Sequence, residues 1–313
     1  EDIDNSSIQN LYSSRTGKFL IVATKKDSIY ELYLYNTETQ KLSQIIREEN
    51  DNNITVEWSP FGDYALIKID KNTGSVIEIF NPDNPELSEN YSFSSPVQNH
   101  QWHDSQYSAT IFISQNKTIW KLNNGNKENL LTINSSVWYI DSQNNIWSVN
   151  NKKLTKNNNE IYNFPEIDID KIIYLGNNQI LIKKSDKILS GHFDNDNVVI
   201  DYDINVNNLT PYSNNNAWLA WTPWELWSIQ NNGSHELYIR SSEMIKTVSP
   251  TENRDTILIL FETRLVGFNS RYFTLHELLK NTDIYSIGNN TKKRQIYFFG
   301  KVANITGIFE MKY

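Results

Sequence analysis

A four-residue pattern recurs along the chain at intervals close to 40 residues. Each copy holds an aliphatic residue, a bulky residue, a variable residue and usually another apolar one, as in IYEL (29–32), IWKL (119–122) and LWSI (226–229). The bulky positions are Tyr30, Ile77, Trp120, Trp147, Leu189, Trp227, Val266 and Phe309. The gaps between them are 47, 43, 27, 42, 38, 39 and 43 residues. A period of about 40 residues is typical of the four-stranded blade of a β-propeller.

A second set of apolar residues lies nine positions before the bulky ones. It comprises Ile21, Ile111, Trp138, Ile180, Trp218 and Ile257. Residues that favour tight turns stand between the two sets, for example Asp27, Gly74 and Asn144. Two strands joined by a short turn give this spacing. We therefore expect the bulky residue on the third strand of each blade and the earlier set on the second strand.

The repeat predicts an all-β fold, a single β-propeller domain of eight blades, each a four-stranded antiparallel sheet. The expected blades are approximately 7–50, 51–94, 95–132, 133–160, 161–206, 207–245, 246–280, and 281–313 with 1–6. Phe309 lies four residues before the end, so the eighth blade has no outer strand of its own. We expect residues 1–6 to supply that strand and to close the propeller. Seven blades is the alternative, because the 27-residue gap makes the fourth blade very short.

Composition narrows the classes of partner. The 313-residue chain has a net charge of −8 and a pI of about 5.2, which excludes the clustered basic surface that nucleic-acid binding needs. No run of 18 apolar residues occurs, so no membrane span is expected. The absence of cysteine excludes disulfides and thiolate metal sites. The opening residues EDIDNSS, without an initiator Met, indicate a processed or excised domain, which we expect to be a monomer.

Several stretches resemble known propeller repeats. VEWSPFGDYALIKI (56–69) resembles the repeat of TolB-like, WD-repeat-like bacterial β-propellers, in which W-S-P-D-G precedes a strand; Phe61 replaces the Asp. Traces of the same repeat are SSRTGKFLIVAT (13–24) and SPTENRDTILIL (249–260). Residues 225–250 and 265–279 are similar to the C-terminal propeller of PEGA-domain surface proteins of bacteria. That resemblance implies a propeller outside the cell, held at the surface by a segment absent from this chain, with no established catalytic residues to transfer.

Few polar residues group in a way that predicts catalysis or metal binding. Asp194 and Asp196 form a D-x-D start typical of calcium loops, but the glycine and final glutamate of an EF-hand are missing, so a polar hairpin tip is favoured. A polar surface is likewise favoured over a metal site for HQWHD (100–104). IDSQNNIW (140–147) is partly similar to a sialidase Asp box without its glycine and threonine. We expect no catalytic residue, metal or cofactor.

Four tryptophans stand at every third position of AWLAWTPWELWS (217–228). Pro223 argues against a helix there. Trp218 and Trp227 occupy the repeat positions of the second and third strands, which predicts that both lie in the blade core. Trp221 and Trp224 stand where other blades have mostly polar residues. We interpret these two as a candidate binding anchor, with packing against a neighbouring loop as the alternative.

The sequence favours a non-catalytic module for protein interaction or structure, located outside the cytoplasm at the cell surface. The first alternative is a propeller that binds carbohydrate or peptidoglycan through exposed aromatic rings. The second is a glycan-active hydrolase that uses carboxylates from different blades. The expected partner is therefore a protein or a cell-wall glycan.

Overall fold

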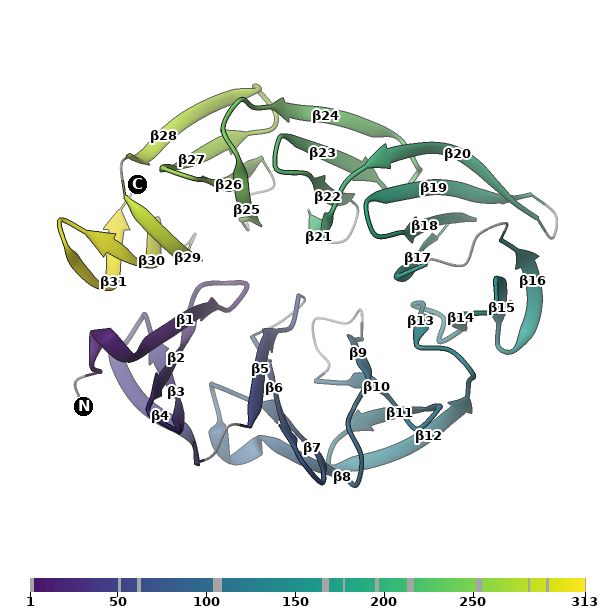
Figure 1. Ribbon diagram of the computed structural model, residues 1–313, viewed down its shortest axis with the longest axis horizontal. Helices are drawn as coiled ribbons and strands as arrows, with labels where there is room; N and C mark the ends of the chain where they lie inside the picture. The colour runs from purple at the N-terminus through teal and green to yellow at the C-terminus, as the bar shows by residue number, and fades with distance from the viewer. Residues whose placement is uncertain are drawn as a thin grey trace. The chain divides into compact units, whose positions relative to one another are not determined.

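The computed structural model is a β-propeller built of eight antiparallel sheets, which confirms the fold predicted from the repeat (Figure 1). It describes residues 3–49, 52–60, 63–103, 109–164, 169–176, 178–194, 197–212, 217–251, 255–280, 282–290 and 293–312. We number the sheets as blades 1 to 8 in chain order and call the strands of each blade first, second, third and outer. Backbone proximity divides the chain into two compact units, Glu1–Pro96 with Glu243–Tyr313, and Val97–Ser242.

The first unit holds blades 7, 8, 1 and 2. Blade 1 contains β1 (Ile8–Ser13), β2 (Phe19–Lys26), β3 (Ile29–Asn36) and β4 (Lys41–Glu49), and blade 2 contains β5 (Asn53–Trp58), β6 (Ala65–Lys71), β7 (Gly74–Phe80) and β8 (Glu89–Phe93). Blade 7 contains β25 (Ile245–Pro250), β26 (Thr256–Phe261), β27 (Arg264–Asn269) and β28 (Thr274–Lys280), and blade 8 contains β29 (Asp283–Asn290), β30 (Gln295–Val302) and β31 (Ile305–Lys312). Two short 3-10 helices, η1 (Asn5–Ser7) and η2 (Pro85–Leu87), complete this unit.

The second unit holds blades 3 to 6. Blade 3 contains β9 (Asn99–Trp102), β10 (Ile111–Gln115), β11 (Thr118–Asn123) and β12 (Asn126–Thr132), and blade 4 contains β13 (Val137–Ile140), β14 (Ile146–Asn150), β15 (Lys153–Lys156) and β16 (Asn159–Asn163). Blade 5 contains β17 (Lys171–Gly176), β18 (Gln179–Lys183), β19 (Lys187–Asp194) and β20 (Asn197–Asn205), and blade 6 contains β21 (Asn208–Tyr212), β22 (Ala217–Trp221), β23 (Glu225–Gln230) and β24 (His235–Arg240).

The apolar runs of the sequence form the second strands, which are buried on both faces. In β2, the residues from Phe19 to Thr24 are all buried, as a sheet covered on both sides requires. The hydrophobic clusters of each unit lie between blades. In the first unit, residues of β2 and β3 pack against β5 and β6, and residues of β26 and β27 pack against β29 and β30. In the second unit, residues of β14 and β15 pack against β17 and β18. Within each unit, neighbouring blades therefore share these cores, and the outer strands carry most of the exposed, polar side chains.

Asparagine forms many of the turns between strands. Pairs of residues with positive φ, such as Asn151–Lys152 and Asn157–Asn158, connect the strands of blade 4. Two consecutive residues with positive φ make the tight hairpin turn whose twist matches that of the strands, and asparagine adopts this backbone conformation more easily than most residues. Asparagine residues of these runs therefore form tight turns between strands.

Seven of the eight bulky repeat positions lie on third strands, and blade 4 is the exception. Trp147 lies on β14, the second strand, and Trp138 lies on β13, the first strand. The third strand of this blade is β15, whose buried residue is Leu154. The 27-residue gap thus arises because Trp147 lies on the second strand of its blade and not on the third. No blade is missing, and the alternative of seven blades is wrong.

The predicted completion of blade 8 by residues 1–6 is wrong for the described part of that segment. Blade 8 has three strands in the order β29-β30-β31, and the N-terminal residues Asn5–Ser7 form η1 instead of a strand. The first and last blades are joined by their first strands, because β1 lies beside β29. Residues of β1 and β2 share a hydrophobic cluster with Tyr297 and Phe299 of β30.

A buried polar network strengthens this join. The Asn290 side chain donates hydrogen bonds to the Gly17 carbonyl (3.2 Å) and to the Thr37 hydroxyl (3.0 Å). The Lys293 ammonium donates to the Thr37 carbonyl (2.7 Å). Buried polar groups of this kind need partners, and here each blade supplies them to the other.

Residues 273–280 contain β28, the outer strand of blade 7, because the polar and apolar residues of TLHELLK pair with β27. In the described part of the chain, no helix is long and apolar enough to cross a membrane.

Candidate functional site

The two candidate tryptophans of blade 6 occupy different environments. Trp221 is the last residue of β22 and only 9% exposed, so its ring is not available to a partner. Trp224 lies in the turn between β22 and β23 and is 51% exposed. Of the two residues, the structure therefore presents only Trp224 to solvent.

The turn that carries Trp224 is held by its own hydrogen bonds. The Thr222 hydroxyl accepts from the backbone N–H groups of Trp224 (3.0 Å) and Glu225 (2.9 Å). The Thr222 N–H donates to the Glu225 carbonyl, and the Ser241 N–H donates to the Trp224 carbonyl. Pro223 fixes its own φ angle between them. An exposed indole thus stands on a backbone with little freedom to move.

A charged pair flanks Trp224. The Glu225 carboxylate accepts hydrogen bonds from the Arg240 guanidinium (2.8 and 2.9 Å) and from the indole N–H of Trp227 (3.2 Å). Arg240 lies on the outer strand β24, so the pair also joins two strands of the blade. The candidate site is the exposed Trp224 ring, together with the Glu225–Arg240 pair that begins at the next residue of the chain.

Trp218 and Trp227 lie where the repeat predicts. Both are half-buried and pack against a cluster that contains Ala220, Ile229 and Ile188. These two rings therefore belong to the core shared by blades 5 and 6.

The polar candidates for metal binding do not come together. Asp194 is exposed at the end of β19, and Asp196 lies outside the described residues. His192 is paired with Asp201, whose two oxygens lie 2.9 and 3.0 Å from Nδ1. Among the residues that the structure describes, no three His, Asp or Glu side chains are grouped to hold a metal ion. Burial and the charge of Lys121 lower the pKa of His103.

Asp141, the carboxylate of the stretch that is partly similar to an Asp box, stabilises a turn. Asp141 is buried and accepts hydrogen bonds from the N–H groups of Gln143 and Asn145 and from the indole N–H of Trp147, each at 2.9 Å. Asn144 adopts a φ of 62°, the conformation that a glycine would otherwise supply. The stretch therefore builds the turn between β13 and β14.

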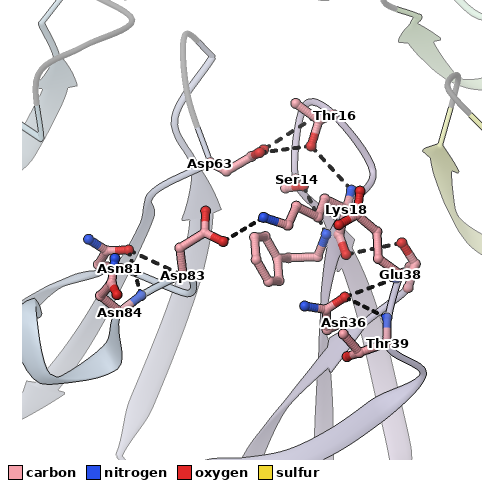
Figure 2. A network of polar contacts seen from close by, with 12 residues as sticks. Ser14, Thr16, Lys18, Asn36, Glu38, Thr39, Asp63, Asn81, Asp83 and Asn84 are labelled. Atoms are coloured by element: carbon pink, nitrogen blue, oxygen red, sulfur yellow. Dashed lines mark hydrogen bonds and ion pairs between the residues drawn. The ribbon is translucent and has the colours of Figure 1, made fainter.

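A second polar cluster joins the turns of blades 1 and 2 (Figure 2). Thr16 donates to Asp63 (2.8 Å), and the Lys18 ammonium pairs with Asp83 (2.5 Å). The hydrogen bond to Asp83 raises the pKa of Lys18. Arg15 of the same turn donates to the Pro60 carbonyl (2.8 Å). Because these side chains bind one another, we assign this cluster to the packing of the two blades.

The structure also exposes aromatic residues that the sequence reasoning did not select. Tyr272 and Phe273 lie between β27 and β28, and Tyr285 lies on β29. The Arg271 guanidinium lies 5.4 Å from the Tyr272 ring centre. Of these exposed aromatic residues, the sequence could single out only Trp224, because the equivalent positions of the other blades are mostly polar. The position of Tyr272 shows no such difference between blades.

Comparison with known proteins supports the fold alone. No protein-family model matches the chain, and no curated protein matches it. Among solved structures, it is similar to Hsv2 of Kluyveromyces marxianus, with 12% identity, a TM-score of 0.51, and coverage of 87% of this chain and 97% of the other. It is also similar to lmo1340, an uncharacterized protein of Listeria monocytogenes, with 14% identity, a TM-score of 0.51, and coverage of 93% and 97%.

Proposed function

We propose that this chain is a non-catalytic β-propeller that works outside the cytoplasm at the cell surface as a module for binding another protein. The observation that carries the proposal is Trp224, a half-exposed ring on a turn held by its own hydrogen bonds. The resemblance of residues 225–250 and 265–279 to the propeller of PEGA-domain surface proteins supports the location. Binding sites on such scaffolds lie in the turns between strands.

A ring in this position suits the centre of an interface. Tryptophan is enriched among the residues that dominate binding energy, because it removes a large apolar area from water. The backbone of the turn is already ordered in the free protein, since Thr222 and Ser241 hold it, so binding need not order this segment of the main chain. Glu225 follows Trp224 in the chain, and its ion pair with Arg240 supplies polar groups next to the turn, as the rim of an interface requires.

Carbohydrate binding is the second candidate, and the same ring supports it. Flat aromatic rings stack on sugars, and the neighbouring carboxylate and guanidinium can form hydrogen bonds with hydroxyl groups. A glycan partner differs from a protein partner in its resistance to protease, and this difference separates the two candidates.

The test measures binding of the purified chain to cell-envelope fractions of the source organism and to purified peptidoglycan. Trp224→Ala should weaken binding to the envelope about 10- to 30-fold, which corresponds to roughly 1.4–2 kcal/mol. Tyr272→Ala, which removes another exposed ring, is the matched control and should bind as the natural chain does. Protease treatment of the envelope should abolish binding.

Two results would contradict the proposal. Equal binding by the natural chain and by Trp224→Ala would show that Trp224 is not part of the binding site. Binding that survives protease and is reproduced by peptidoglycan would replace the protein partner with a glycan.

A further inference from the structure

We propose that a buried water molecule binds between blades 5 and 6, where it joins the side chains of Gln179, Ser190 and Tyr202. Gln179 and Ser190 lie on β18 and β19, the second and third strands of blade 5, and Tyr202 lies on its outer strand β20. The site faces the turn between β23 and β24 of blade 6, and both blades belong to the second unit. Trp224 lies at the opposite end of β23, so the inference does not depend on the proposed function.

Three side-chain oxygen atoms of blade 5 are buried without a hydrogen-bond partner among the described residues. They are the amide oxygen of Gln179 and the hydroxyl oxygens of Ser190 and Tyr202. Ser190 is 0% exposed, so water at the protein surface does not solvate its hydroxyl. Buried polar groups in proteins are nearly always hydrogen-bonded, and an ordered water molecule is the usual partner where no protein group bonds them.

The three oxygens lie beside one glycine of the blade 6 turn. A Cβ atom built on Gly233 would lie 2.7 Å from the Gln179 amide oxygen and 3.7 Å from the Ser190 hydroxyl oxygen. Ser190 pairs directly with Tyr202 across β19 and β20. Burial raises the pKa of Tyr202, whereas the Ser190 hydroxyl beside it lowers this pKa. The oxygens therefore share one neighbourhood, next to a position that carries no side chain.

Blade 6 shows how a buried serine at the same repeat position is satisfied by the protein itself. Ser228 is the equivalent of Ser190, and both serines are 0% exposed. The Ser228 hydroxyl accepts a hydrogen bond from the side-chain amide of Gln230 (2.9 Å). In blade 5 the equivalent of Gln230 is His192, whose Nδ1 lies 2.9 Å from the Asp201 carboxylate. Because His192 bonds Asp201, Ser190 lacks the partner that Ser228 has.

Apolar and aromatic groups separate the site from bulk solvent. Leu181 and Ile188 lie on the same face of β18 and β19 as the three oxygens, and both belong to the hydrophobic cluster shared by blades 5 and 6. The Tyr202 ring lies against the ring of His235 on β24, with 3.9 Å between their centres. A water molecule held here therefore exchanges slowly with the solvent.

The donors and acceptors of the site fit water. The amide oxygen of Gln179 only accepts hydrogen bonds, whereas each hydroxyl both donates and accepts. One water molecule can donate to Gln179 and to one hydroxyl and accept from the other, which gives the three bonds typical of buried water. An anion would be repelled by the Gln179 oxygen. A hard cation prefers carboxylates, and Asp201, the carboxylate next to Tyr202 in the chain, is paired with His192.

A crystal structure of the whole chain, at a resolution that shows ordered water, tests the proposal directly. We expect a peak of electron density at about 2.7–3.2 Å from the Ser190 hydroxyl, the Tyr202 hydroxyl and the Gln179 amide oxygen. No such peak should lie at Ser228, whose hydroxyl already bonds Gln230.

Nuclear Overhauser contacts between water and amide protons test the site in solution. The Ser190 amide should show a strong contact with a long-lived water molecule. The Ser228 amide is the matched control, because its hydroxyl is equally buried and exchanges protons in the same way. Its contact with water should be weak or absent.

Two glycine variants show whether the water occupies the space beside the turn. Gly233→Ala places a Cβ atom among the oxygens and should remove the Ser190 contact with water. Gly176→Ala is the control: the two glycines have φ angles of 84° and 89°, but no atom lies within 4 Å of a Cβ at Gly176. Tyr202→Phe replaces Gly233→Ala if that variant does not fold. It removes one bond to the water without adding volume, so the Ser190 contact should weaken.

The proposal is overturned if the natural chain shows no density at this place, or if the Ser190 and Ser228 amides show equal contact with water. It is also overturned if Gln179, Ser190 and Tyr202 bond one another directly. A peak with contacts of about 2.3–2.6 Å, typical of a hard cation, would replace the water with a metal ion.

Discussion

Single backbone positions set how closely the blades approach one another. Gly17, in the turn between β1 and β2, has a φ of 67°, and a Cβ atom built there would lie 1.8 Å from the carbonyl oxygen of Asn289 in blade 8. Its own carbonyl accepts the buried hydrogen bonds of Asn290 and Thr37. Both the conformation and the space at this position therefore require glycine.

Gly17→Ala should lower the free energy of unfolding by at least about 3 kcal/mol, because the backbone strain adds to a clash with backbone atoms. Gly125→Ala is the matched control: its φ is 73°, but no atom lies within 4 Å of the added Cβ. It should cost only about 1–2 kcal/mol. Urea unfolding followed by circular dichroism measures both, and equal losses would show that the approach of Gly17 to blade 8 is unimportant.

At the scale of elements, blade 4 shows what the repeat could and could not predict. The apolar positions, the turns and the number of blades followed from a period of about 40 residues, because each blade needs the same alternation of strands. The strand assignment of Trp147 failed, since the true third strand KLTK has only one apolar residue, Leu154, and is shorter than the others. Trp147 has a second role that a repeat cannot reveal, as a hydrogen-bond donor to Asp141.

Asp141→Ala should destabilise the chain by about 2–4 kcal/mol, because it leaves the N–H groups of Gln143 and Asn145 and the Trp147 indole without their acceptor. Asp186→Ala, an exposed residue in the turn between β18 and β19, is the control and should change stability by less than about 0.5 kcal/mol. The urea midpoints of the two variants and the natural chain, measured by circular dichroism, give the two changes in stability. A loss at Asp141 no larger than that at Asp186 would contradict the role given to this carboxylate.

The candidate site illustrates a second limit of the sequence. Trp221 and Trp224 have the same contrast with polar residues in other blades, yet one is buried and the other exposed. The difference arises because Trp221 is the last residue of a strand and Trp224 follows Pro223 in the turn. A repeat indicates that a residue is unusual, whereas only the position of the backbone shows which way its ring faces.

At the scale of the whole molecule, the two ends of the chain meet at blades 8 and 1 without sharing a sheet. Tyr297 is central to this contact: it packs with Ile8, Leu11 and Leu20, and its ring meets Tyr35 edge-on at 6.3 Å. Its hydroxyl donates to the Gln295 side chain (3.0 Å). Burial, with the charge of Glu310 as a smaller cause, raises the pKa of Tyr297 to about 12.

This pKa predicts a loss of stability at alkaline pH. Below about pH 10, the ordinary pKa of tyrosine, Tyr297 keeps its proton in both the folded and the unfolded chain, and its contribution to stability is complete. Between about pH 10 and 12, the unfolded chain releases the proton while the folded chain retains it, so unfolding becomes more favourable as pH rises. Tyr297→Phe has no hydroxyl to ionise, and its urea midpoint should fall less steeply over this range than that of the natural chain. Tyr285→Phe removes an exposed hydroxyl from the same blade and should retain the natural slope. Identical slopes for Tyr297→Phe and the natural chain would show that the contact between the first and last blades does not depend on a protonated Tyr297.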